Sequence, residues 1–373
     1  MKDFTRFVGL DESMDAIQVA IASARHPGEV REYGSIANTP EALRKLVRRL
    51  GRLEECLFAY EAGPCGYETY RFLSSMGAKC LVVAPSKTPR RVGDRIKNDR
   101  RDAVGLARLL RAGELSPVWV PDEETEAMRD LSRSREDAAY AQTRARQRLL
   151  SFLLRHGRRY TGKTRWVEAH LRWLAGQQFP HPSQQVALEE YLGAVEETTR
   201  RVRRLDQQIA EQVPNWSMAP VVKALMAHRG VSLLVAATVV AELGDLTRFD
   251  NAPELMGFVG LVPSLRASGL THHTGAITKT GNSHVRRILT EAAWAYRLPA
   301  RRSPHLRRRL HGQSPEVQQL AWKAQVRLCG RFRRMRARGK HHNIVVTAIA
   351  RELLGFLWAT ALLVAPTEPC TAH

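Results

Sequence analysis

Strand-like runs are confined to the first part of the chain, and this distribution constrains the fold more than any other sequence feature. Helical patterns separate the runs, at residues 40–50 and 67–76, and a further helix is expected at 101–111. Alternating short strands and helices are typical of an α/β domain, which we expect at residues 1–120. The strand-like runs span residues 7–11, 17–22, 57–61 and 80–84.

A long charged stretch without strand signals follows, from Asp122 to about Val213, and a break at residues 179–182 divides it into two expected long helices. In the second helix apolar residues recur every seven positions, as in a coiled-coil seam. An amphipathic helix packed on its own domain would show the same pattern. Either interpretation makes residues 121–212 a helical spacer or dimerisation arm. The recurring residues are Leu188, Val195, Val202 and Ile209, with Tyr191, Thr198 and Leu205 in companion positions.

Residues 213–365 are expected to form a third, mostly helical domain, followed by a tail at 366–373. Pro214 and Pro220 bracket its start, and one glycine-rich loop interrupts it at 257–281. The segment 222–245 resembles a helix-hairpin-helix, a module whose turn can hold backbone phosphates. Its apolar part is equally typical of a buried helix, and both descriptions can hold together.

Positive charge is in large excess, with 58 Lys and Arg against 37 Asp and Glu and a formal net charge of +21. A field of that sign favours polyanions, so nucleic acid is the first partner to consider. Residues 297–340 contain fourteen Lys or Arg and one acid, Glu316, and this concentration favours phosphate contacts. The cations expected to bind nucleic acid in this region are Arg307, Arg308, Arg331, Arg333 and Arg334.

The five cysteines are odd in number and form no C-x-x-C pair, which argues against a disulfide framework and a zinc site. The N-terminus lacks a signal-peptide core, and the apolar stretch at 353–364 is too short to span a bilayer. We therefore expect a cytoplasmic protein with no membrane partner.

Four acidic residues occur at positions where they can converge. Asp11 and Glu61 each lie at the end of a strand-like run, and Asp99 and Asp102 lie three apart at the start of a helix, on one face. Carboxylates in such positions can bind hard cations, and two ions can stabilise both oxygens of a phosphodiester exchange. Taken singly, each acid is better explained by a structural role. Glu12, Asp15 and Asp94 are lower-ranked competitors nearby.

Ser268 precedes Gly269 in the glycine-rich loop, where a glycine lets the backbone approach a phosphate closely. The following segment leads into a helix whose N-terminus and cations offer an anion site. By composition alone Ser268 is better explained as a turn residue, because a serine needs a base or metal to become a nucleophile, and Ser264 and Ser283 are equally ordinary. The cations are Lys279, Arg286 and Arg287, and His272 and His273 are either proton-transfer groups or solvated surface.

These residues together resemble the insertion-sequence transposases that have an N-terminal RuvC-like DEDD domain and a C-terminal serine-bearing transposase domain, guided by a bridge (seeker) RNA. The resemblance covers nearly the whole chain, to about residue 365. The motifs that carry it are Gly9-Leu10-Asp11, Tyr60-Glu61-Ala62-Gly63, residues 97–103, residues 260–263 with Ser268-Gly269, and residues 278–282 with Arg286-Arg287.

The resemblance implies a RuvC/RNase H-like α/β domain, a helical coiled-coil arm and a mostly helical transposase domain. It implies that Asp11, Glu61, Asp99 and Asp102 bind one or two Mg²⁺ ions, and that Ser268 attacks DNA to form a covalent phosphoserine intermediate. It also implies RNA-directed pairing of donor and target DNA, and a homo-oligomer, dimer or tetramer, in which different protomers supply the carboxylates and the serine. Leu270 and Thr271 depart from the more polar residues expected after the Ser-Gly pair.

Two other functions fit the same sequence. A RuvC-like nuclease or junction resolvase would use metal-activated water, with Ser268 as a bystander. A non-enzymatic binder of RNA or DNA would bind with a steep salt dependence and stay inert with magnesium. The acidic quartet argues against the second alternative, because a phosphate binder has no use for carboxylates among arginines.

Overall fold

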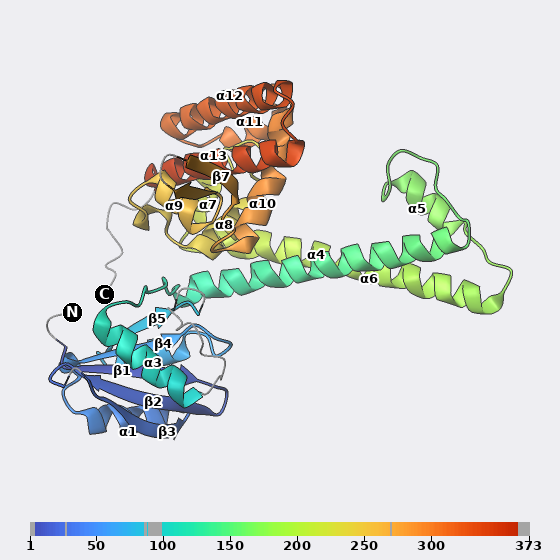
Figure 1. Ribbon diagram of the computed structural model, residues 1–373. Coiled ribbons are helices and arrows are strands. Elements are labelled where there is room, and N and C mark those ends of the chain that lie inside the picture. Colours follow the sequence, from blue (N-terminus) through green and yellow to red (C-terminus); the bar gives the residue numbers. More distant parts are fainter. Residues whose placement is uncertain (1–3, 27, 86–87, 89–98, 269–270, 365–373) are drawn as a thin grey trace. The chain divides into compact units, whose positions relative to one another are not determined.

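A computed structural model describes residues 4–26, 28–85, 88, 99–268 and 271–364, with the backbone alone described for 99–100, 266–268 and 271–272. The chain divides into two compact units, Met1–Val120 and Pro121–His373 (Figure 1). The predicted arm and third domain both lie in the second unit, so a domain boundary near residue 213 stays a prediction.

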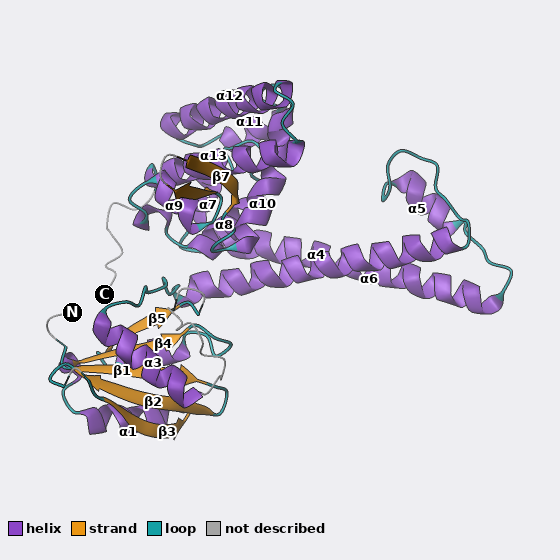
Figure 2. Cartoon of the chain, in the orientation of Figure 1, coloured by secondary structure: helices purple, strands orange, loops and turns teal. Residues whose placement is uncertain are grey.

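The first unit is a mixed five-stranded sheet with helices on both faces (Figure 2), which confirms the expected α/β class. The strand order is β3-β2-β1-β4-β5, with β1 antiparallel to β2 and parallel to β4. The third strand was missed in the sequence. The elements are β1 (Arg6–Glu12), β2 (Ala16–Ser23), β3 (Val30–Ala37), α1 (Pro40–Leu50), η1 (Leu53–Glu55), β4 (Cys56–Glu61), α2 (Glu68–Ser75), β5 (Lys79–Val83) and α3 (Asp99–Ala112).

Alternation along the strands separates two apolar cores. Val8 and Leu10 of β1 pack with Leu43 and Leu46 of α1 on one face. Phe7 packs with Leu106 and the rest of the buried side of α3 on the opposite face. Successive side chains of a strand point to opposite faces, so Phe7, Gly9 and Asp11 share the face that α3 covers.

Helix α3 runs antiparallel to β1. Near its C-terminus the Arg111 guanidinium donates to the carbonyl of Ser23, and Ser23 pairs with Arg6 at the start of β1. Further along, a Cβ on Gly9 would lie 2.4 Å from the carbonyl oxygen of Ala103 and 2.5 Å from the nitrogen of Ala107. Only glycine therefore allows this approach, which directs the N-terminus of α3 towards the carboxyl end of β1.

The arm consists of α4 (Glu123–Arg155) and α6 (Pro182–Gln212), joined through α5 (Glu168–Ala175). The expected two long helices are present, although the first ends at Arg155, well before the predicted break. Leu188 and Val195 pack against Leu149 of α4, and all four heptad residues of α6 are buried within the chain itself. This packing favours the second interpretation of the pattern, an amphipathic helix covered by its own unit.

The helical body of the second unit surrounds one large apolar cluster. Its longest apolar helix, α13, meets the length and composition of a membrane span, but half of that window is buried. Residues such as Ile349 and Leu353 lie in the cluster, which makes α13 a core helix. The elements are η2 (Val213–Asn215), α7 (Ala219–Leu225), α8 (Leu233–Leu243), η3 (Leu246–Arg248), α9 (Ala252–Phe258), α10 (Ser283–Ala293), η4 (Trp294–Arg297), α11 (Pro304–Leu310), α12 (Pro315–Ala337) and α13 (His342–Leu362).

The prediction that strands end with the first domain was wrong. The glycine-rich loop contains an antiparallel hairpin of β6 (Pro263–Ser268) and β7 (Thr271–Ile277). Glycines, a proline and serines are turn signals in this segment, and the described residues of its two strands are exposed or half-buried, so the strands lack the apolar alternation of a buried face. The hairpin is stabilised by pairing rather than by a buried face.

The helix-hairpin-helix interpretation and the buried-helix interpretation describe the same segment. Helices α7 and α8 form a helical pair, and the residues of α8 from Val235 to Leu243 are all buried. In the turn, Gly230 has φ +82° and lies against α10, where a Cβ would approach the Ala292 carbonyl oxygen to 2.3 Å. Close packing on α10 accounts for this glycine.

Candidate active site

Asp11 and Glu61 lie side by side at the ends of two parallel strands. Leu10 pairs with Tyr60, and each acid is the next residue along its strand. The alternation that places Gly9 on the α3 face places both acids there as well. Both are half-buried. The parallel pairing of β1 with β4 is enough to bring these two predicted site residues together.

The two aspartates of α3 begin the helix at the same end of the sheet. Ala103 lies over Gly9. Four residues of helix advance about 6 Å and two residues of strand about 6.6 Å, so the backbone places Asp99 at the level of Asp11. Asp102 is exposed, one residue before the buried Ala103. The side chain of Asp99 lies outside the described residues.

Carboxylate oxygens are the donors that magnesium prefers, and this set of acids has the right chemistry for it. Within the residues whose side chains are described, no three His, Cys, Asp or Glu are grouped closely enough to hold a metal ion. Asp99 and the segment before it are not among those residues. The fit therefore rests on the donor type and on the sheet face that the strand acids share.

The competing acids occupy different surroundings. Glu12 accepts a hydrogen bond from the hydroxyl of Thr69 in α2, on the opposite face of the sheet. Burial raises the pKa of Glu12, and the Thr69 hydrogen bond offsets part of that rise. Asp15 is exposed in the turn between β1 and β2. Asp94 lies outside the described residues, as do Lys97 and Asn98.

Ser268 is the last residue of β6, and its Cα pairs with that of Thr271 at the start of β7. The serine is thus at the tip of the hairpin, although its side chain, Gly269 and Leu270 lie outside the described residues. His273 pairs with Arg266 further from the tip and is exposed. Ser268 is therefore the residue of β6 that lies nearest the hairpin tip.

The base of the hairpin is closed by two glycines in the left-handed region. Gly260 has φ +72°, and a Cβ there would lie 2.1 Å from the Thr280 carbonyl oxygen. Gly281 has φ +70°, and its Cβ would lie 1.9 Å from the Phe258 carbonyl oxygen. The Arg286 guanidinium donates to the carbonyls of Val259, Thr280 and Gly281 at 2.9, 2.7 and 3.1 Å. A cation expected to bind nucleic acid therefore also ties the two ends of the hairpin together.

A buried carboxylate links this base to the arm. Glu242 of α8 accepts two hydrogen bonds from Arg133 of α4, at 2.8 and 2.9 Å. It also accepts one from Asn282 at 2.6 Å, and Asn282 caps α10 by accepting from the Val285 nitrogen. Burial raises the pKa of Glu242, but the bonds from Arg133 and Asn282 outweigh it and leave the pKa below its usual value.

A second ion-pair group lies beside the first on α4. Glu136 accepts from Arg287 Nε and pairs with His284 Nδ1, both at 2.7 Å. Burial raises the pKa of Glu136, yet the bonds from Arg287 and His284 outweigh it and hold the pKa at about 2. Arg287 also pairs with Glu291 at 2.8 Å. The guanidinium of this predicted nucleic-acid-binding residue is thus engaged within the chain.

The other predicted cations differ in their surroundings. Arg331 pairs with Glu352 at 2.5 Å, whereas Arg308, Arg333 and Arg334 are exposed. Lys279 is exposed, with φ +57° at the base of the hairpin. Arg307 lines a hollow of about 600 Å³, which the sequence did not indicate. The other residues of this hollow are Arg301, Arg302, Ser303, Pro304 and Trp322.

Comparison with known proteins identifies both halves of the chain. Residues 222–311 match the model of the transposase IS116/IS110/IS902 family, and residues 8–157 match a DEDD transposase model of the IS110 type. The chain is 48% identical over 356 residues to the putative transposase y4qE of Sinorhizobium fredii, covering 95% of this chain and 88% of the relative. It is 33% identical to the transposase for insertion sequence element IS1533 of Leptospira borgpetersenii, covering 90% of this chain and 97% of the relative.

The chain belongs to the IS116/IS110/IS902 family of insertion-sequence transposases. It is therefore a DNA transposase, an enzyme of DNA recombination. The segment 8–157 that matches the DEDD-type model contains the positions of Asp11, Glu61, Asp99 and Asp102, and a domain of this type suggests a divalent metal. The segment 222–311 that matches the second model contains the position of Ser268. The resemblance noted in the sequence is confirmed at the level of the family.

Proposed function

We propose that this transposase breaks and rejoins DNA through a covalent phosphoserine at Ser268, with magnesium held by Asp11, Glu61, Asp99 and Asp102 in a RuvC-like domain. The observation that carries the proposal is the common sheet face of Asp11 and Glu61, towards which Gly9 directs the N-terminus of α3. Magnesium bound there would stabilise negative charge on the phosphate undergoing exchange.

The serine step conserves the energy of the phosphodiester. The Ser268 oxygen forms a bond to phosphorus as a bond to one sugar oxygen breaks, its proton passes to a base, and the leaving oxygen takes up a proton. One DNA end is then joined to the protein, and the other carries a free hydroxyl. Attack by a hydroxyl of the second DNA reverses the step and releases the serine.

A structured bridge (seeker) RNA would choose the donor and target DNA by base pairing. The cationic segment around α11 and α12 supplies phosphate contacts for such a complex, because Arg307, Arg308, Arg333 and Arg334 are exposed there. The protein would act as a homo-oligomer in which the carboxylates and the serine come from different protomers. Leu188 and Val195 of the heptad pattern in α6 are already buried against α4, so other surfaces would form the oligomer.

The decisive experiment follows the covalent adduct. The full chain with its co-purifying RNA, magnesium and labelled donor DNA should yield a protein–DNA adduct that resists denaturant and contains a phosphoserine at Ser268. Ser268→Ala should abolish the adduct and leave DNA binding intact. The matched control is Ser264→Ala, in the same strand, which should keep the adduct.

Two outcomes contradict the proposal. An undiminished adduct in Ser268→Ala rules out this nucleophile. Cleaved DNA ends without any adduct indicate the alternative, a RuvC-like nuclease or junction resolvase that uses activated water. Chelation of magnesium, and separately Asp11→Asn, should stop adduct formation while Ser268 remains in place. Sequencing the co-purifying RNA tests guidance, because a guide must contain segments that match the donor and the target DNA.

A further inference from the structure

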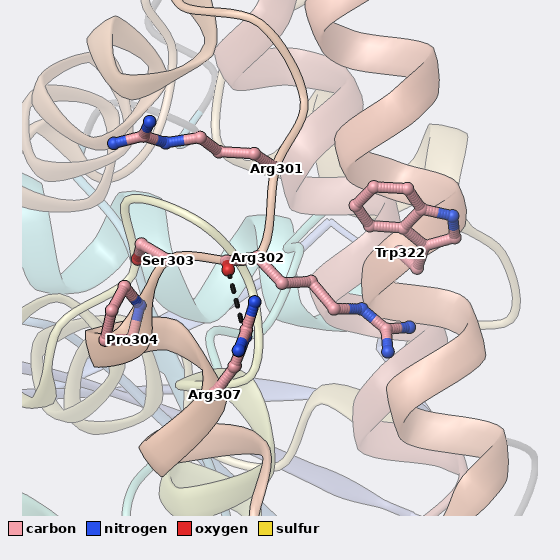
Figure 3. A pocket seen from close by; sticks show the side chains of 6 residues that line it. All are labelled: Arg301, Arg302, Ser303, Pro304, Arg307 and Trp322. Carbon is pink, nitrogen blue, oxygen red and sulfur yellow. Dashed lines mark hydrogen bonds between the residues drawn. The ribbon is translucent and has the colours of Figure 1, made fainter.

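The hollow beside α11 combines arginines with one aromatic ring. Figure 3 shows Trp322 of α12 on one side and the segment Arg301 to Ser303, followed by α11, on the other. Its volume of about 600 Å³ lies within the range of ligand sites, roughly 300–1,000 Å³. The six lining residues include three arginines and no acid. An anion that also carries a flat apolar group suits this lining.

The Trp322 ring is placed to stack. Trp322 as a residue is 37% exposed, although tryptophan is usually well covered. The guanidinium of Arg302 lies over the ring, 5.2 Å from its centroid, so the face already accepts a planar group (Figure 3). Nucleobases stack on tryptophan and on arginine in the same way.

The wall opposite the ring is held in place. The buried Gln325 of α12 donates to the carbonyl of Arg301 at 3.0 Å, and Arg307 Nε donates to the carbonyl of Arg302 at 3.2 Å. The hydroxyl of Ser303 accepts from the Leu306 nitrogen at 3.3 Å. The arginine backbone is therefore fixed before any ligand arrives, which lowers the entropic cost of binding.

We infer that this hollow binds an unpaired nucleotide of a single-stranded nucleic acid, with the base stacked on Trp322 and the flanking phosphates bound by Arg301, Arg302 and Arg307. Bases in a duplex are stacked on their neighbours and do not present a free face. The hollow would thus recognise a looped or extruded nucleotide of RNA or DNA without reading its sequence. This site goes beyond the proposed chemistry and does not depend on Ser268.

The test measures binding of the full chain to fluorescently labelled octamers by anisotropy. Trp322→Leu should weaken binding to single strands about tenfold or more and leave duplex affinity unchanged. Trp322→Phe should restore most of the affinity, because a phenyl ring still stacks. Val326→Ala, an exposed position one turn along α12, is the matched control and should change nothing. Comparing uridine with deoxythymidine octamers tells whether the strand is RNA, DNA or either.

Photocrosslinking gives an independent readout. A single strand that carries 5-iodouracil should crosslink to Trp322, and the adduct should be found by mass spectrometry. Unchanged single-strand affinity in Trp322→Leu overturns the inference, and so does an equal loss for duplex. Circular dichroism of Trp322→Leu excludes unfolding as the cause of any loss. None of these assays requires catalysis, so failure of the serine mechanism and failure of this site are distinguishable.

Discussion

The two units position their candidate residues by different forces. In the first, α3 approaches β1 through Gly9, and backbone lies on backbone with apolar side chains around it. In the second, the base of the serine hairpin is joined to α4 by the carboxylates of Glu242 and Glu136 and their cationic partners. Steric packing responds to side-chain volume, whereas buried ion pairs respond to protonation and to loss of a partner.

This difference suits the two proposed tasks, metal binding by the acids and attack on DNA by the serine. Under the proposed function the acids of the first unit would hold metal ions and should not be needed as structural supports, and the packing of α3 on β1 through Gly9 can position them instead. A hydroxyl at a hairpin tip has no such constraint, so ionised groups beneath it can provide the support. The contrast predicts which unit each mutation or pH change will affect, with the largest effects where a buried charge loses its partner.

Glu242→Gln should cause the largest loss, because it leaves Arg133 facing a neutral amide in a buried position. Breaking a buried ion pair costs about 3–5 kcal/mol, and the partial exposure of Arg133 places the expected loss near 3 kcal/mol. Denaturant unfolding of the second unit, followed by hydrogen exchange in α8 and α10, measures it. A loss of stability confined to the first unit would contradict the conclusion that buried ion pairs stabilise the second unit.

Acid should destabilise the second unit through His228. Burial lowers the pKa of His228 to about 4, against 6.5 for an exposed histidine. The unfolded chain therefore binds a proton at His228 more readily than the folded chain. The stability that the neutral, buried His228 contributes is complete above pH 6.5 and is lost as pH falls from 6.5 to about 4. The loss is at most about 3 kcal/mol, measurable by denaturant unfolding across that interval.

His228→Gln is the matched variant for this pH dependence. Thr360 donates its hydroxyl to the Phe356 carbonyl, so the His228 Nε2 donates to Thr360, and a glutamine amide can replace that donor. The variant should flatten the stability profile between pH 6.5 and 4. A persistent slope would assign it to other groups. Glu136 acts at lower pH, because its stabilising charge is lost between 4.5 and about 2.

Most of the N-terminal sheet could be predicted from sequence, because most of its strands are indicated by their own residues. The apolar runs of β1, β4 and β5 and the helix at α1 were each recognisable from their own residues, and the acids followed from their strand ends. β3 alternates weakly, since its residues are exposed or half-buried, and was missed. The neighbouring positions of Asp11 and Glu61 became definite only with the register of β1 on β4, which pairs the preceding residues, Leu10 and Tyr60.

The structure of the second unit was harder to predict from sequence, because its important contacts join residues that are distant in the chain. Nothing near Glu242 indicates that its partners are Arg133 and Asn282. The hollow at Trp322 likewise combines α12 with the segment before α11. A tryptophan within an arginine-rich segment was the sequence feature that could have indicated this hollow. Counting the cations of the segment did not draw attention to it. The side-chain placement of Ser268 and Asp99 stays a prediction.

Gly9→Ala should have an intermediate effect on the first unit. The added methyl group would meet backbone atoms of α3 at 2.4 and 2.5 Å, which cannot move like a flexible side chain. Overpacking of this kind costs about 1–3 kcal/mol. It should also displace the N-terminus of α3 and lower adduct formation. Gly105→Ala is the control, because a Cβ there has no neighbour within 4 Å and should stabilise the helix by about 0.5–1 kcal/mol.

The smallest effect is expected at an exposed ion pair of the arm. Arg200 and Glu196 are paired at 3.4 Å, with side chains 69% and 71% exposed. Such i,i+4 pairs contribute about 0.3–0.5 kcal/mol, and salt screens them. Glu196→Gln should therefore change denaturant unfolding by less than about 0.5 kcal/mol. A loss comparable to that of Glu242→Gln would mean that charge pairing by itself stabilises this unit, and that burial of the carboxylates beneath the hairpin is not what distinguishes them.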